Sequence, residues 1–141
     1  MKISAKGRYA LLATSYMAHI GGSVSVNTIS EKLGISKIYL EQVFSLLRGA
    51  GIVSSTKGAG GGYTLTRDAS DITALDILRP TSPTLFDGGA ASQDQPGMAV
   101  DTLVVQALSE SVISTLSKVT VADISKLGFP DASGSPIMYY I

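Results

Sequence analysis

The stretch VNTISEKLGISKIYLEQVFSLLRGAG, residues 26–51, decides the fold. Apolar residues recur at three- and four-residue spacing on both sides of Gly34, which predicts two short helices joined by a tight turn. Ser36 stands at the N-cap of the second helix, and Ala50 and Gly51 end it. Two short helices joined in this way are typical of a helix-turn-helix unit, whose second helix presents its N-terminal polar face to the major groove of DNA.

The period of the sequence changes directly after this unit. Residues 52–56 are rich in β-branched side chains, residues 57–61 form a glycine-rich turn, and residues 62–66 alternate as a returning strand. A β-hairpin that follows a helix-turn-helix is a wing. Lys57 places a positive charge at its tip, and the glycines allow positive φ and close approach of the backbone. The predicted fold class is therefore mainly α with a small β-hairpin wing, a winged helix-turn-helix.

Three further short helices are predicted, each with a hydroxyl side chain at its N-cap. The caps are Ser4 for an amphipathic helix over residues 9–20, Thr73 for a fourth helix that ends at Pro80, and Thr120 for a last helix that ends at Gly128. Asp76 and Asp123 stand at the capping-box positions of the last two helices.

A long helix is predicted over residues 98–119, about 33 Å long at ~1.5 Å per residue. Its apolar arc is wider than the ~100° stripe of a one-sided surface helix, so we expect it to pack against a partner as well, most simply its copy in a homodimer. The expected organisation is a winged helix-turn-helix domain at 1–78, a linker loop at 79–97, a dimerisation helix and short last helix at 98–128, and a C-terminal tail at 129–141.

The charge of the chain divides between its two parts. The 141 residues carry 11 basic and 11 acidic side chains, a net charge of zero. Residues 1–67 hold eight bases and two acids, a net +6, whereas residues 68–141 hold three bases and nine acids, a net −6. Such asymmetry indicates nucleic-acid or membrane contact by the basic part.

Composition excludes several classes of protein. The chain has no Cys, which excludes disulfides, cysteine-ligated iron–sulfur clusters and cysteine-containing zinc sites. Its only histidine, His19, stands alone, and no nucleophile–base constellation is present, so we expect no enzyme, no metal and no cofactor. No run approaches 18 uncharged apolar residues, so no membrane span is expected. We interpret residues 9–20 as a helix of the mature protein and not as a signal peptide, which implies the cytoplasm.

The charges and polar groups of the basic part predict two kinds of DNA contact, to phosphates and to base edges. Lys2, Lys6, Lys37 and Lys57 fall where a winged helix would meet phosphates. Ser36 and Gln42 are the better candidates for base edges, since Gln can pair bidentately with adenine.

Four motifs resemble one family. MKISAKGRYA (1–10), ISKIYLEQ (35–42), KGAGGGY (57–63) and DIT (71–73) together resemble the Rrf2 (Rrf-two) family of winged-helix transcriptional repressors. The resemblance implies a homodimer that binds imperfect palindromes of double-stranded DNA, with the long helix crossing its partner. It also implies that Ser36 and Gln42 read bases, that Glu41 contributes to discrimination, and that Lys57 enters the minor groove. The full set of predicted DNA contacts is Lys2, Lys6, Ser36, Lys37, Tyr39, Glu41, Gln42, Lys57, Gly58 and Gly60.

The same resemblance separates two branches of the family. Cluster-binding members carry three cysteines in the linker, and this chain has none. The ending IMYYI (137–141) instead resembles the cysteine-metabolism repressors, which implies control of cysteine or sulfur genes and a complex with O-acetylserine sulfhydrylase (cysteine synthase). Tyr139, Tyr140 and Ile141 would bind that enzyme through the terminal carboxylate; the alternative is a tail docked on the dimer. Two other functions stay open: a cluster-free sensor of another small molecule, and a winged-helix adaptor that has lost DNA binding.

Overall fold

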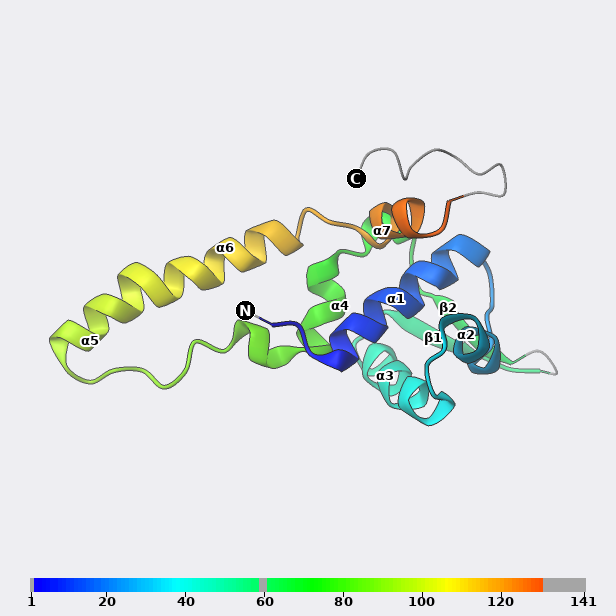
Figure 1. Ribbon diagram of the computed structural model, residues 1–141, viewed down its shortest axis with the longest axis horizontal. Helices are drawn as coiled ribbons and strands as arrows, with labels where there is room; N and C mark the ends of the chain where they lie inside the picture. The colour runs from blue at the N-terminus through cyan, green and yellow to red at the C-terminus, as the bar shows by residue number, and fades with distance from the viewer. Residues whose placement is uncertain (1, 59–60, 131–141) are drawn as a thin grey trace.

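The structure, a computed structural model, describes residues 2–58 and 61–130, and it joins a winged-helix head to one long projecting helical rod (Figure 1). The head contains α1, α2, α3, β1, β2, α4 and α7, and the rod contains α5 and α6. The bounds are α1 Ala5–Ile20, α2 Val26–Leu33, α3 Lys37–Gly49, β1 Val53–Thr56, β2 Gly62–Leu65, α4 Ala74–Thr81, α5 Gln95–Val100, α6 Gln106–Leu116 and α7 Val121–Gly128.

The helix-turn-helix prediction is confirmed in its local details. The Ser25 hydroxyl accepts from the Thr28 backbone N–H to begin α2, and Gly34 ends it in the left-handed conformation at φ 67°. The Ser36 hydroxyl then accepts from the Tyr39 N–H at 3.1 Å to begin α3. The inner face of α3 is buried in the core, through Leu40, Val43, Phe44 and Leu47.

Helix α1 is the centre of the head and not a one-sided amphipathic helix. It packs against α7, α4, α3 and α2, with α7 and α3 on opposite sides (Figure 1). Ser4 caps it as predicted. Ile20, the last residue of the predicted amphipathic helix, is 50% exposed, whereas the polar side chains of Thr14 and Ser15 are buried and donate to backbone carbonyls of α1 itself. The second covered face comes from α7, which arrives more than 100 residues later.

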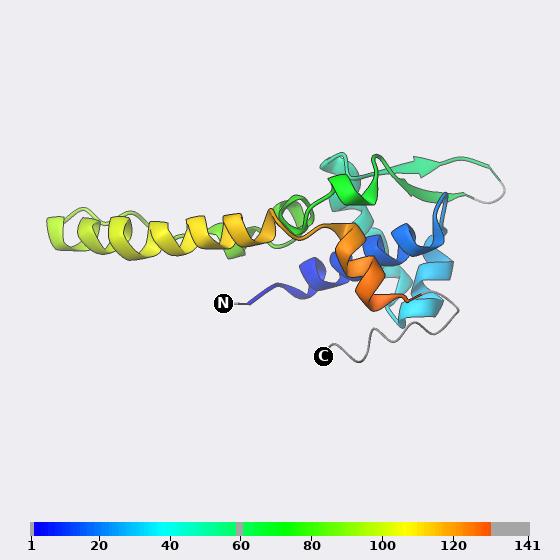
Figure 2. The ribbon, with the colours of Figure 1, turned by 90° about the horizontal axis from the view of Figure 1, so that it is seen from above.

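The wing is the predicted two-stranded antiparallel hairpin, with Val53 opposite Leu65 and Thr56 opposite Gly62. A bridge missed by the sequence analysis anchors it to the head, because Val24 and Tyr63 exchange two backbone hydrogen bonds of 2.9 Å. A Cβ at Gly62 would stand 2.3 Å from the Val24 carbonyl oxygen, so only glycine fits there. The wing and the rod extend toward opposite ends of the molecule (Figure 2).

The predicted capping boxes of α4 and α7 are both present, and the two helix starts lie side by side. Thr73 and Thr120 form an isolated antiparallel bridge, in which the Ala74 N–H donates to the Val119 carbonyl at 2.7 Å and the Val121 N–H to Ile72 at 2.8 Å. This contact returns the chain to the head after the rod.

The region between α4 and the rod differs from the predicted loop over 79–97. Pro80 lies inside α4, which continues to Thr81: the proline removes only its own N–H bond, and the Ser82 N–H still donates to the Leu78 carbonyl at 2.7 Å. A 3₁₀ turn follows at Pro83–Phe86, and the rod already begins at Gln95. The loop proper is therefore shorter than predicted.

The rod runs continuously over Gln95–Leu116, so the predicted bounds of 98 and 119 are wrong at both ends. The Asp94 side chain caps it, and Val119 lies beyond it in the bridge to α4. A π-helical turn at Asp101–Val105 adds a residue to its middle and rotates the residues that follow. Ile113 of α6 is half-buried.

The rod is apolar and uncovered. Its 22 residues include an 18-residue window of mean hydropathy 1.2, none of it buried, so by length and composition alone it could cross a membrane. The expectation of no membrane span rested on uncharged runs alone, whereas this window contains Asp101 and Glu110.

Candidate nucleic-acid interface

The outer face of α3 is the first part of the candidate interface. Because Leu40, Val43 and Phe44 fix the inner face in the core, Ser36, Lys37, Glu41 and Gln42 are turned outward and are exposed. The Ser36 hydroxyl oxygen is engaged as the helix cap, but its proton stays available for donation to a base or phosphate.

Helix α1 contributes Lys6 to the same surface. Lys6 lines a shallow hollow of about 490 Å³ together with Glu41 and Gln42; Ile38, Ser45 and Leu46 complete its lining. The N-terminal segment is held in place because the Ser4 N–H donates to the Ser82 hydroxyl at 3.0 Å. The fold therefore brings one lysine from the start of the chain to the predicted base-reading glutamine. Lys2 is exposed but does not line this hollow.

Tyr39, also a predicted DNA contact, lies between α1 and α3. Its half-buried ring meets Tyr9 edge to face, with ring centroids 5.2 Å apart. This contact joins α3 to α1, and the contact of Tyr39 with DNA stays a prediction. The pairing of the two tyrosines joins residues 30 apart, which no local pattern indicates.

The wing supplies the second part of the interface. Lys57 and Gly58 are exposed near its tip, and Gly58 has φ 114°, as the predicted glycine turn requires. Gly60 lies outside the described residues. At the base of the wing, Arg67 pairs with Asp76 of α4 at 3.0 Å and donates to the Asp71 carbonyl at 3.1 Å. Sequence reasoning missed this clamp, which ties the wing to α4.

The basic side chains of the interface are not neutralised within the described residues. There, Arg67–Asp76 is the only ion pair within 4 Å, and Lys6, Lys37 and Lys57 have no acidic partner. Exposed ammonium groups of this kind are suited to phosphates, whose contacts set affinity and register.

Three carboxyl groups with perturbed pKa values are structural. Partial burial raises the pKa of Asp76, but hydrogen bonds from Thr73 and the nearby Arg67 outweigh it and lower the pKa. Hydrogen bonds from Thr120 lower the pKa of Asp123, and those from Ser70 lower the pKa of Asp68. Asp76 and Asp123 cap helices and Asp68 caps a 3₁₀ turn, so these acids hold elements in place.

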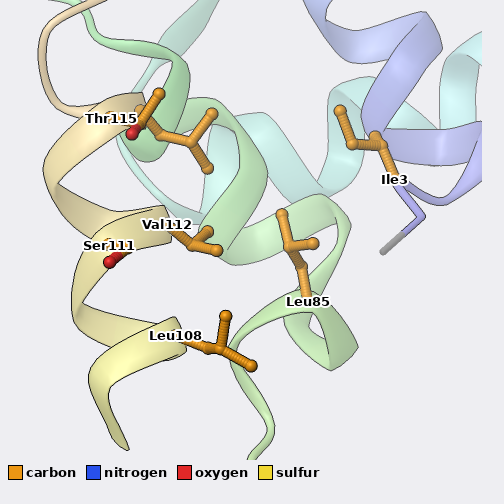
Figure 3. Close-up of a pocket in the computed structure, with 7 residues that line it drawn as sticks. Ile3, Leu85, Leu108, Ser111, Val112 and Thr115 are labelled. Carbon is orange, nitrogen blue, oxygen red and sulfur yellow. The ribbon is translucent and has the colours of Figure 1, made fainter. Parts of the chain in front are cut away.

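A second surface lies on the rod. An apolar groove of about 390 Å³ runs between α6, the Pro83–Phe86 turn and the N-terminal segment (Figure 3). Leu108 and Val112 of α6 face Leu85 and Ile3 across it. Further exposed apolar side chains continue along the rod, at Met98, Val100, Leu103 and Val104. Each of these side chains is more than half exposed.

These two surfaces, a winged helix with free lysines and an uncovered apolar rod, define a winged-helix DNA-binding regulator. Comparison with known proteins agrees: a family model described as Rrf2, iron-dependent transcriptional regulator, matches residues 3–126. The chain belongs to the Rrf2 family of transcriptional regulators. Membership in a family of regulators supports the expectation that the chain is not an enzyme.

Individual relatives come from two groups. The transcriptional regulator IscR of Photorhabdus laumondii is 48% identical over 80 residues, 55% of this chain and 49% of that protein, so the match spans about half of the relative. The structure of CymR, the global cysteine regulator of B. subtilis, superposes with a TM-score of 0.77 at 33% identity, covering 93% of this chain and 99% of that one. The structure of T. potens IscR gives 0.76 at 36% identity, covering 99% and 97%.

The iron that the family description names does not fit the donor set of this chain. The sequence has no Cys and a single His. His19 stacks on Phe129 with ring centroids 5.5 Å apart and planes 20° apart. Within residues 2–58 and 61–130, no group of three His, Asp or Glu side chains could hold a metal ion. We therefore derive no role through iron.

Proposed function

We propose that this chain is a cytoplasmic, sequence-specific DNA-binding repressor that acts as a homodimer on an imperfect palindrome. The observation on which this proposal depends is the juxtaposition of Lys6, Glu41 and Gln42 in one exposed hollow on the recognition helix. In the proposed complex, Ser36 and Gln42 contact base edges and Glu41 discriminates between bases. Lys2, Lys6 and Lys37 contact phosphates, and Lys57 enters the minor groove beside Gly58.

The rod supports the homodimer. Its apolar side chains are exposed along both α5 and α6, and the groove lined by Leu108 and Val112 offers a continuous surface to a second copy. A membrane is the other occupant that its hydropathy allows. Asp101 and Glu110 within the rod argue for the dimer, because ionised carboxylates at membrane depth are costly.

Control of cysteine or sulfur genes is the specific role that we propose. The likeness to CymR, the global cysteine regulator of B. subtilis, supports it, whereas the absence of cysteine argues only against a cluster-binding regulator. The ending IMYYI would recruit a partner such as O-acetylserine sulfhydrylase (cysteine synthase) through Tyr139, Tyr140 and Ile141. These residues lie outside the described structure, so the support here is the sequence alone.

Binding to genomic fragments tests the proposal. Promoters of cysteine-synthesis genes and unrelated promoters are titrated by fluorescence anisotropy at several salt concentrations. Three to five phosphates neutralised per subunit predict a log–log salt slope of about −5 to −9 for the dimer. Specific binding to the cysteine promoters alone supports the role; specific binding only elsewhere points to the cluster-free sensor. No specific binding to any fragment overturns the proposal in favour of a protein-interaction adaptor.

The tail is tested separately. Wild type and a chain lacking Ile141 are compared for binding to purified cysteine synthase by calorimetry. Loss of binding on removal of this single residue supports capture of the terminal carboxylate. Equal binding by both chains contradicts it and leaves the DNA-binding proposal unaffected.

A further inference from the structure

Ile38 is an apolar side chain in an unexpected place. It lies in the first turn of α3, on the outward face, and 72% of it is exposed. The other branched apolar residues of that helix, Leu40, Val43, Leu46 and Leu47, are buried or only about one-third exposed. Packing of the head therefore does not explain the isoleucine.

The position of Ile38 ties it to the candidate base-reading residue. Ile38 and Gln42 are four residues apart, on one face of α3, and both line the hollow to which Lys6 contributes. Four residues of α-helix rise about 6 Å. Base pairs of B-DNA are spaced by ~3.4 Å, so two side chains with this spacing reach positions one or two base pairs apart.

The chemistry of an aliphatic side chain in the major groove is restricted. It cannot hydrogen-bond to a base edge, and the apolar group that the major groove presents is the 5-methyl group of thymine. Over a cytosine amino group or a guanine oxygen, the same side chain would remove water from a polar atom without replacing its hydrogen bond.

We propose that Ile38 is a specificity-determining residue that packs against the methyl group of a thymine, one or two base pairs from the adenine paired by Gln42. This inference rests on the proposed function. It predicts an A·T-rich pair of positions in each half-site, with the thymine recognised by its methyl group and not by its hydrogen-bonding edge.

Replacement of thymine by uracil tests this directly, because dU keeps the pairing edge of dT and lacks only the methyl group. Wild type first selects duplexes from a random-sequence pool. Each thymine of the selected half-site is then changed to dU, and Kd is measured for wild type, Ile38→Ala and Leu127→Ala. Leu127 of α7 is a matched control, since it is 63% exposed and lies outside the interface.

For wild type we expect one thymine per half-site at which dU weakens binding about three- to fivefold, the effect of one lost methyl contact. Ile38→Ala should fold with an unchanged Tm and be insensitive to dU at that position, whereas Leu127→Ala should keep the full effect. If wild type selects a site but no thymine is sensitive, or if Ile38→Ala is equally sensitive, the inference is wrong. If wild type selects no duplex, the proposed function itself fails.

Discussion

The head and the rod of this chain differ in how much of their apolar side chains is buried. In the head, Ile29, Leu40 and Phe44 are completely buried, and α1 is covered on two sides. In the rod, the most apolar window has no buried share, and Leu103 is 74% exposed. A helix of this kind gains little from folding alone, because the stability of helices comes mainly from packing an apolar face. The head can therefore be complete in one chain, whereas the rod needs a second surface.

The largest expected loss of stability comes from a substitution in the head. Phe44 is fully buried and stacks on Tyr63 of the wing with ring centroids 4.6 Å apart. Phe44→Ala should lower the free energy of unfolding by about 3–5 kcal/mol, because it leaves a cavity beneath the wing. Urea unfolding followed by circular dichroism measures it. Ser45→Ala, the exposed neighbour, is the control, and a similar loss in both variants would show that the head is not packed as described.

Charge in the rod should dissociate the proposed dimer while the head stays folded. Leu103→Asp combined with Leu108→Asp places charge on the apolar surface, and we expect the dimer to dissociate at least ~100-fold more readily, because an unpaired charge would be buried. Sedimentation should then show a 14.6 kDa monomer whose head unfolds as a cooperative unit. The control adds the same charge at exposed polar positions, Thr102→Asp with Ser114→Asp.

Two results would contradict the assignment of the rod as a dimer interface. If wild type is itself monomeric at concentrations at which DNA is bound, the rod is not a dimer interface. If wild type sediments with lipid vesicles and the Leu103/Leu108 variant does not, the rod contacts a membrane and the dimer proposal fails.

The contact between the starts of α4 and α7 lies in the head, where the chain returns from the rod, and its caps should have an intermediate effect. The Thr73 hydroxyl accepts from the Asp76 N–H at 3.1 Å, and the Asp76 carboxylate accepts from the Thr73 N–H at 3.0 Å. Thr73→Ala should cost about 1 kcal/mol of unfolding free energy in thermal or urea melts. Thr73→Ser, which keeps the hydroxyl, is the matched control. Equal losses in both would mean that the methyl group, and not the cap, is responsible.

The same contact makes stability depend on pH in a defined direction. The folded pKa of Asp76 lies below its ordinary 3.8, so its contribution is complete above that value and is lost as pH falls through the folded pKa. Acid should therefore destabilise wild type below about pH 4, and Asp76→Asn should flatten that part of the profile. Melting temperatures between pH 2.5 and 6 measure it. An Asp76→Asn profile as steep as that of wild type would assign the acid sensitivity to other carboxylates.

The features that the sequence could predict depend on residues that are close together in the chain, and the features that it could not predict depend on residues that are far apart. The caps at Ser4, Ser36, Thr73 and Thr120, and the hairpin of the wing, depend on residues a few positions apart, and all of them are confirmed. The second buried face of α1 depends on α7, and the anchoring of the wing depends on the bridge at Val24 and on the Arg67 clamp to α4. None of these contacts produces a periodic pattern in the local sequence, because the residues or elements that meet belong to separate parts of the chain.

The candidate site was predictable to the same extent. The exposed polar face of α3 follows from its apolar stripe, which the sequence shows directly. The meeting of Lys6 with Gln42, the Tyr9–Tyr39 contact and the Arg67 clamp depend on how α1, α3, the wing and α4 pack. The exposure of Ile38 could not be predicted in the same way, because an apolar side chain in a helix is expected to be buried and a methyl contact needs neither charge nor hydrogen bonds.

The smallest predicted effect is that of Lys57→Ala, which tests whether the wing contacts DNA phosphates. Lys57 is exposed and has no ion-pair partner among the described residues, so Lys57→Ala should leave stability unchanged. If one phosphate per subunit loses its partner, the log–log salt slope of the dimer should become less steep by about 1.8, with a modest and sequence-independent loss of affinity. Anisotropy titrations on specific and random duplexes measure both quantities. Lys118→Ala, an exposed lysine beyond the end of the rod, is the control, because removal of a charge far from DNA should not change the slope. A slope that Lys57→Ala leaves unchanged would mean that the wing does not reach the phosphates and that the basic interface is confined to α1 and α3.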